Sequence, residues 1–177
     1  MRWQFYKQDP KDTINNPIAG EFFSGEAVRD AATALVREAL QNSLDARPQN
    51  SDVPARVRIH LSEDSGRLAA GAAQPWFNGI WTHAHAEGNG LSDRPTQNDG
   101  CPYIVIEDFN TTGLEGNSEA YAVDLGSRNN FLSFFRAFGH SDKRAHSKGS
   151  WGVGKTVFPR SSRLSSFFGF TVRASDG

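Results

Sequence analysis

The stretch Lys148–Phe158, KGSWGVGKTVF, constrains the fold of this chain more than any other. Its segment Gly149–Thr156 matches the pattern GxxxxGK[ST], a loop that cradles phosphates with its backbone N–H groups, follows a buried strand and opens a helix. The same stretch also has the spacing GxxGxG, with Gly149, Gly152 and Gly154 as the hinge of a lid over a nucleotide. Both interpretations predict a bound nucleotide, but they require different arrangements of strands and helices.

The residues around this stretch favour a lid over a P-loop. The segment GHSDKRAHSK, which ends at Lys148, is polar and positively charged, so it is unsuited to the buried strand that a P-loop follows. Pro159 would fall within the first turns of the helix that a P-loop opens. A P-loop fragment remains the alternative. In either fold, the predicted phosphate-binding residues are Gly149, Trp151, Gly152, Val153, Gly154, Lys155 and Thr156.

Composition excludes several classes of protein. The chain has 177 residues, enough for one domain with a core, and its net charge of −1 gives no overall attraction to nucleic acid or membrane. Cys101 is the single cysteine, so no internal disulfide can form and a reducing compartment is expected. The N-terminus has no secretory signal, and no apolar run reaches the about 20 residues of a membrane span. We therefore expect a cytoplasmic protein without a membrane partner.

Two stretches predict helices. The longer covers Gly25–Ala46, where Ser24 or Gly25 can cap the start. The shorter covers Arg128–Phe138 and is closed by Gly139. In the longer stretch, apolar residues at helical spacing predict a buried face made of Val28, Ala31, Ala32, Leu35 and Ala39.

Three stretches predict strands. Strict alternation in RVRIHLS indicates a half-buried strand over Arg56–Ser62, and YIVIEDF indicates a buried strand over Tyr103–Phe109. A further strand is predicted over Arg163–Arg173, RLSSFFGFTVR. Residues 63–102, which are dense in Gly, Pro, Asn and Ala, are expected to form a loop-rich hairpin connection or insertion.

Polar residues on the long helix invite a chemical explanation. Glu38 and Asn42 are four residues apart and Asp45 follows three later, so all three project from nearly one face. They could be the polar edge of an amphipathic helix, or Glu38 could deprotonate a water while the amide oxygen of Asn42 binds magnesium. Further along, Asp108 in IEDFNTTGL follows a predicted strand. Its carboxylate could cap a turn or accept a hydrogen bond from an exocyclic amine.

The order of these motifs resembles that of the GHKL ATPases. ExxxNxxDA on a helix, DxxxxG after a strand and GxxGxG after a lid occur in this superfamily, which includes gyrase B subunits, the large heat-shock chaperone, mismatch-repair ATPases and sensor histidine kinases. The resemblance covers roughly Glu26 to Arg173. It implies one ATP-binding domain over residues 1–177 with the Bergerat fold. That fold is α/β (α+β), a two-layer sandwich of a mixed, mostly antiparallel sheet with helices on one face.

The resemblance also implies a role for each matched residue. Glu38 would be the general base, Asn42 the magnesium ligand and Asp108 the acceptor for the adenine amine. Gly113 would line the adenine pocket, and the GxxGxG glycines would hinge a lid over residues 114–149. The other nucleotide-binding positions that it implies are Asp45, Ala46, Asn110 and Thr111. At position 110 the family usually has glycine, and asparagine is among the few other residues that tolerate a positive φ.

The activity implied by the resemblance is magnesium-dependent ATP hydrolysis, slow in the isolated domain. ATP would drive homodimerisation, and further domains or subunits would respond. The chain ends soon after its last predicted strand, which favours a piece of a larger machine that could act on DNA or in bacterial antiviral defence. Two other hypotheses stay open: an ATP-gated scaffold that hardly hydrolyses, and a nucleic-acid-binding module that uses the basic segment 128–163.

Overall fold

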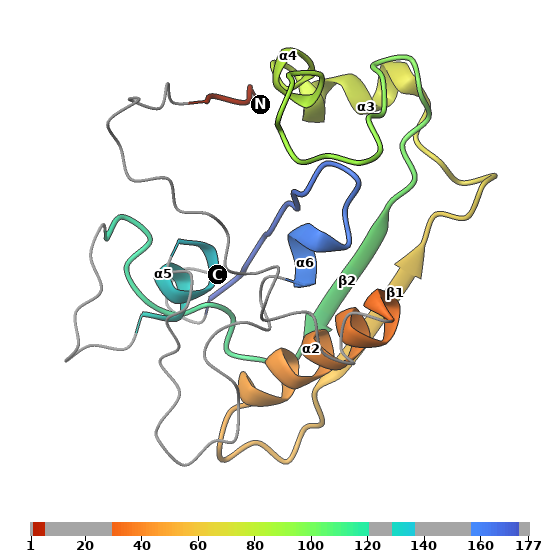
Figure 1. Ribbon diagram of the computed structural model, residues 1–177. Helices are drawn as coiled ribbons and strands as arrows, with labels where there is room; N and C mark the ends of the chain where they lie inside the picture. Colours follow the sequence, from red (N-terminus) through yellow and green to blue (C-terminus); the bar gives the residue numbers. More distant parts are fainter. Residues whose placement is uncertain (1, 6–29, 121–128, 137–156, 174–177) are drawn as a thin grey trace.

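A computed structural model describes residues 2–5, 30–120, 129–136 and 157–173 (Figure 1). Those residues combine helices with a small antiparallel sheet and therefore form a mixed α+β structure. None of their helices is long and apolar enough to cross a membrane. In chain order the elements are α2 (Ala31–Asp45), β1 (Arg56–Leu61), α3 (Ala70–Phe77), α4 (Trp81–Ala84), β2 (Ile104–Phe109), α5 (Asn130–Phe135) and α6 (Val157–Arg160).

Strands β1 and β2 form an antiparallel pair whose register runs from Arg56 opposite Phe109 to Leu61 opposite Ile104. Both predicted strands are confirmed, each one residue shorter than expected. Because side chains alternate along a strand, Ile106 lies on one face of the sheet and Glu107 on the other. The Ile106 face packs against helices, while the Glu107 face is open to solvent in the described residues.

The third predicted strand is wrong. Residues 163–173 form neither a strand nor a helix in the structure. Leu164 and Ser165 turn back on Ser162: the backbone N–H of Ser165 bonds to the Ser162 carbonyl at 2.9 Å, and Ser165 itself has a φ of 49°. Beyond this turn, aromatic side chains and the hydroxyl of Thr171, rather than a backbone ladder, hold the chain.

Helix α2 begins later than predicted, because Asp30 has extended backbone angles and caps it. The Asp30 carboxylate accepts hydrogen bonds from the N–H groups of Ala32 and Thr33, both at 3.1 Å. The predicted caps at Ser24 and Gly25, and Val28 of the predicted stripe, lie outside the described residues. Ala31 and Ala32 of the predicted stripe are exposed. The buried face consists of Ala34, Leu35, Ala39 and Ser43.

The described core lies where α2 meets α6 and β2 (Figure 1). Ala34 and Leu35 of α2 pack with Val157 of α6, and Ile106 and Phe158 complete the cluster. Small residues on α2 allow close approach, while aromatic and branched residues from the other elements fill the volume. This packing fixes the position of α2 on the sheet.

The predicted insertion, residues 63–102, does connect β1 to β2 as a hairpin, but it is less loop-rich than expected. It contains α3 and α4 in spite of Pro75 inside α3. A stem of paired residues joins it to the sheet. At the base of this stem, the backbone N–H of buried Ser62 bonds to the Tyr103 carbonyl at 3.0 Å, and the Ser62 hydroxyl accepts from the Tyr103 N–H at 3.0 Å.

Helix α5 is shorter than the predicted helix of residues 128–138. Asn129 caps it by accepting a hydrogen bond from the Leu132 N–H at 2.9 Å, and Arg136 ends it. Gly139, which was expected to close it, lies outside the described residues. Most of the predicted lid, residues 121–128 and 137–149, also lies outside them.

Candidate functional site

Helix α2 and strand β2 run in the same direction, which brings two of the predicted motifs together. At one end, Ile106 packs against Ala34 and Leu35. At the other end, the backbone N–H of Thr112 donates to the carbonyl of Ala46 at 2.9 Å. The helix between these contacts is ~17 Å long and the extended chain spans at most ~20 Å, so the two segments are matched in length.

Asp108 follows Ile106 by two residues, so its side chain projects from the same face of β2. Glu38 and Asn42 lie on α2, whose C-cap Ala46 is bonded to Thr112 just beyond β2. The structure therefore connects the two predicted motifs at their ends. No hydrogen bond joins Asp108 to Glu38 or Asn42 in the described residues, and a common site for the three side chains stays a prediction.

The amide of Asn42 is the most informative group in this region. Within the part of the chain that the structure describes, its Nδ2 atom is buried and has no hydrogen-bond partner. A buried amide without a partner costs about 1–3 kcal/mol. A 180° turn of the amide places its oxygen at the same point, so the group can offer either a donor to a phosphate oxygen or an acceptor to a cation. Asn42 is therefore suited to a ligand on this face of α2.

Glu38 lies one turn earlier on the same face and is partly buried. Its Oε1 atom is 3.6 Å from Nε of Arg37, a loose ion pair. A half-buried carboxylate with one weak partner remains able to accept a proton from water.

Asp108 differs from the prediction in one respect. It was expected at the end of a buried strand, but β2 is only partly covered and Asp108 is exposed. The described sheet has only two strands, so Asp108 has a neighbouring strand on one side alone. The Asp108 carboxylate accepts a hydrogen bond through Oδ1 from the Thr111 hydroxyl at 3.3 Å. It combines a turn-capping role with an accessible acceptor.

The turn after β2 confirms the expectation for Asn110. Its φ is 62°, in the left-handed region that asparagine tolerates better than most residues. Its side-chain Nδ2 also donates to the carbonyl of Pro54 at 2.9 Å, which ties the turn to the segment before β1. The turn is therefore kept without the usual glycine.

Gly113 occupies a position that admits no other residue without movement. Its φ is 68°, and a Cβ atom there would lie 2.3 Å from the carbonyl oxygen of Val172. The neighbouring N–H of Leu114 donates to the hydroxyl of Thr171 at 2.9 Å. Sequence reasoning missed Thr171, because neither spacing nor composition links it to a turn 57 residues away. The backbone of Val172 and the hydroxyl of Thr171 thus support the turn.

The remaining predicted residues divide into two groups. Asp45 is the exposed last residue of α2, and Ala46 is its C-cap, whose N–H bonds to the carbonyl of Asn42 at 3.1 Å. Helix α6 directly follows Thr156 and is a single turn that contains Pro159. The phosphate-binding residues Gly149, Trp151, Gly152, Val153, Gly154, Lys155 and Thr156 lie outside the described residues.

The open face of the sheet has a different character. Arg58 donates from Nε to Glu107 at 2.6 Å. This bond holds the pKa of Glu107 below its usual range and raises the pKa of Arg58. Arg56 stacks over the ring of Phe109, 4.4 Å from its centroid. None of the predicted site residues that the structure describes projects from this face of the two strands, which makes the Glu107 carboxylate a useful control for Asp108.

Comparison with known proteins adds no relative: no protein-family model, curated protein or solved structure matches the chain. Among the described residues, no cluster of three or more His, Cys, Asp or Glu side chains could hold a metal ion. Any cation at this site would therefore depend on few protein ligands, as magnesium bound with phosphates and waters does.

Proposed function

We propose that this chain is an ATP-binding domain of the GHKL type that hydrolyses ATP with magnesium. The observation that carries the proposal is the buried, unpartnered amide of Asn42 on the helix face that also presents Glu38, with Asp108 on the neighbouring strand. A carboxylate, an amide and a second carboxylate in this order match the three chemical tasks of such a site: activating water, holding the cation and recognising the base.

The donors fit magnesium, which prefers oxygen ligands and retains several waters. The amide oxygen of Asn42 would hold the ion, and a bound ion would supply charge neutralisation for the phosphates. Glu38 would accept the proton of the attacking water. Asp108 would accept a hydrogen bond from the adenine amine with the oxygen that Thr111 leaves free. The glycine-rich residues 149–154 and Lys155 would contact the phosphates.

The proposed architecture is the two-layer sandwich of the Bergerat fold, a mixed and mostly antiparallel sheet with helices on one face. In its support, α2 and α6 contact each other, and Ile106 of β2 packs against the cluster that they form. The domain would dimerise on binding ATP and transmit the closure to further domains or subunits in the cytoplasm. Machines acting on DNA or in bacterial antiviral defence are candidate settings.

Binding of magnesium-ATP by calorimetry tests the proposal. Asp108→Asn should abolish detectable binding. The carboxylate offers two acceptor oxygens, whereas the amide replaces one of them with an NH2 donor, which cannot accept a hydrogen bond from the adenine amine. Lys155→Ala should weaken binding by about tenfold, the loss of one charge-assisted contact. Glu107→Gln is the matched control, a neighbouring carboxylate on the open face, and should bind like the wild type. Normal binding by Asp108→Asn with none by Lys155→Ala would instead favour the P-loop.

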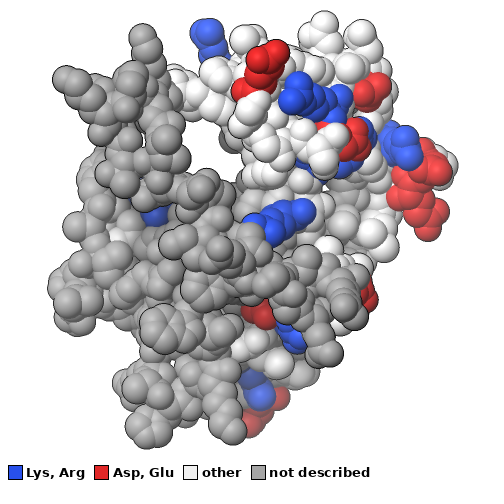
Figure 2. Space-filling view, in the orientation of Figure 1, with Lys and Arg blue, Asp and Glu red and all other residues white. Residues whose placement is uncertain are grey.

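Glu38→Gln separates an enzyme from an ATP-gated scaffold. An enzyme should retain binding and lose at least about 100-fold in turnover. A scaffold would show the same ATP-dependent dimerisation in both forms and no turnover to lose. A nucleic-acid module without ATP is the remaining alternative, and it would use the basic segment 128–163, most of which lies outside the described residues. On the face in Figure 2, basic and acidic side chains of the described residues are interspersed.

A further inference from the structure

Phe168 lies in an aromatic cluster drawn from three separate parts of the chain. Its ring centroid is 5.4 Å from that of Trp76, 5.9 Å from that of Trp3 and 6.3 Å from that of Phe77. Two of these pairs are edge-on, the favourable geometry for aromatic rings. We call Trp3, Trp76, Phe77 and Phe168 the aromatic clamp.

The clamp joins the N-terminal residues to the insertion. The backbone N–H of Trp3 donates to the carbonyl of Asn78 at 2.9 Å, and its indole Nε1 donates to the carbonyl of Trp76 at 2.7 Å. Trp3 is therefore fixed by two directed bonds as well as by ring contacts. Together with α3 it contacts the ring of Phe168, which remains 45% exposed.

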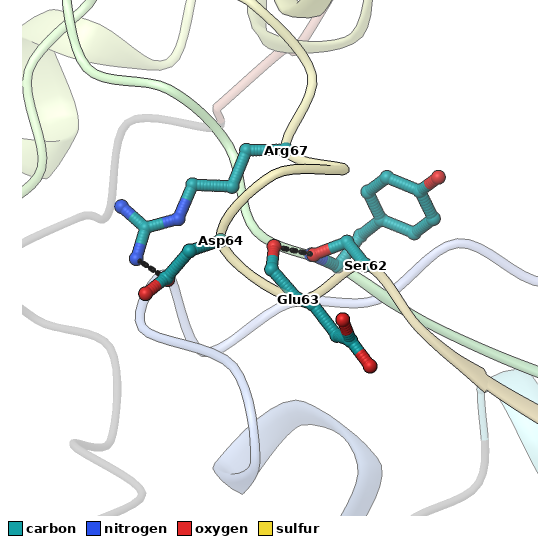
Figure 3. Close-up of polar contacts among 5 residues, drawn as sticks. Ser62, Glu63, Asp64 and Arg67 are labelled. Atoms are coloured by element: carbon teal, nitrogen blue, oxygen red, sulfur yellow. Dashed lines mark hydrogen bonds and ion pairs between the residues drawn. The ribbon is translucent and has the colours of Figure 1, made fainter.

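The insertion that carries α3 is itself anchored to the sheet. Past the Ser62–Tyr103 pair at its base, Leu68 and Cys101 exchange two backbone hydrogen bonds, at 3.0 and 2.8 Å. Arg67 and Asp64 form an ion pair in the turn between these pairs (Figure 3). The stem limits the freedom of the insertion relative to β1 and β2, so the clamp has a fixed base.

On its other side, the Phe168 segment meets a second aromatic cluster. Phe167 contacts Phe134, Phe135 and Phe158, with ring centroids 5.7–6.1 Å apart. Gly169 lies so close to Phe135 that an added Cβ would be 2.4 Å from its ring. Adjacent residues therefore project into two clusters, and the segment is held from both sides.

Three residues beyond Phe168, the same segment reaches the candidate site. The Thr171 hydroxyl accepts from the Leu114 N–H at 2.9 Å, and the Val172 carbonyl packs against Gly113. This stretch has no backbone ladder to fix its position. Aromatic contacts hold its start, and the bonds of Thr171 to Leu114 and of the Arg173 guanidinium to the Gly116 carbonyl, at 2.6 Å, hold its end. A shift of Phe168 along the chain direction would move Thr171 away from Leu114.

We propose that the aromatic clamp is a positioning device for the candidate site. By holding Phe168, the insertion and Trp3 set the place of Thr171 and Val172, and through them the turn at Gly113. Phe168 is thus a positioning residue that does not contact the nucleotide. The effect on nucleotide binding rests on the proposed function, whereas the effect on the turn does not.

Amide hydrogen exchange at Leu114, measured together with magnesium-ADP affinity, tests the proposal. Phe168→Ala should raise exchange at Leu114 and weaken ADP binding, each by about tenfold, with exchange at Ala39 in α2 unchanged as the internal reference. Phe168→Tyr preserves the ring and should restore both values. Phe170→Ala is the matched control, since Phe170 is 92% exposed and lies two residues away in the same segment.

Exchange at Leu114 tests the aromatic clamp, and ADP affinity tests the proposed nucleotide site. Unchanged exchange at Leu114 in Phe168→Ala overturns the clamp, because it shows that Phe168 does not hold the turn at Gly113. Equal acceleration at Leu114 and Ala39 also overturns it, because it indicates general unfolding. Faster exchange at Leu114 in Phe168→Ala, combined with a wild type that fails to bind ADP, upholds the clamp and overturns the nucleotide site. Equal effects of Phe168→Ala and Phe170→Ala also overturn the clamp.

Discussion

Two segments support the turn at Gly113, and they do so by different means. Helix α2 has its own ladder of hydrogen bonds, a cap at Asp30 and a buried stripe of small residues, and it meets the turn through one backbone bond from Thr112 to Ala46. The segment 167–173 has no regular structure and meets the turn through a hydroxyl and a carbonyl. Local interactions maintain the first segment, and tertiary contacts maintain the second.

This difference predicts how each side fails. A helix distributes strain over many bonds, so single changes in α2 should produce graded losses of stability. A segment without regular structure lacks such a ladder of backbone hydrogen bonds, so the loss of one side-chain contact there should displace the whole segment. The candidate site depends on both, which makes the segment 167–173 the more sensitive support.

The largest effect is expected at the turn itself. Gly113→Ala combines positive-φ strain with a clash against the Val172 carbonyl and should lower the free energy of unfolding by about 3 kcal/mol or more. Gly88→Ala is the matched control, because Gly88 has a φ of 73° with open space around it. It should cost only about 1 kcal/mol, the strain alone. Urea denaturation measures both, and equal losses would contradict the close contact at Gly113.

A smaller effect is expected at Gly169, where the obstacle is a side chain. Gly169→Ala places a Cβ against the Phe135 ring, which can move, so the loss should be about 1–3 kcal/mol. Phe135→Leu in the same chain should recover part of this loss by vacating the space. Thermal or urea unfolding of the single and double variants provides the comparison. Additive losses would show that the two residues are not in contact.

The smallest effect is expected at the cap of α2. Hydrogen bonds from Thr33 and Ala32 lower the pKa of Asp30 in the folded protein, so the carboxylate contributes stability above its unfolded pKa of about 4. That contribution is lost as pH falls through the lowered value. Asp30→Asn should keep the cap at neutral pH and remove the acid sensitivity of the cap. Asp30→Ala should lower the melting temperature both at pH 7 and at pH 3. Melting curves at pH 7 and pH 3 decide; identical acid sensitivity in Asp30→Asn and the wild type would contradict this role.

Sequence reasoning succeeded where the signal was local. The existence of β1 and β2, the body of α2 and the positive φ of Asn110 follow from side-chain pattern and backbone sterics, and all are confirmed. The predicted burial of the two strands is wrong: β1 is exposed at every residue but Val57, and β2 is at most partly buried. The spacing of Glu38 and Asn42 needed only the geometry of one helix. Their assigned roles in chemistry stay predictions.

It failed where distant contacts decide. Gly and Pro in residues 63–102 indicated loop, yet α3 forms there with Ala73 buried and Trp76 accepting a bond from Trp3. Residues 163–173 have the composition of a strand, but aromatic rings from elsewhere hold them instead. Thr171 was unrecognisable in advance for the same reason, since its partner, Leu114, belongs to another segment.

The paired stem below the insertion also makes that insertion separable. Its two ends lie one strand spacing apart at Ser62 and Tyr103, the separation that a short hairpin turn closes. Loop length changes closure entropy slowly, by about 0.6 kcal/mol per doubling, so the register of β1 and β2 does not depend on what the stem carries. Residues 63–102 can therefore be replaced by a tight turn. The replacement would leave β1 and β2 paired and would remove both Trp76 and Phe77 from the aromatic clamp.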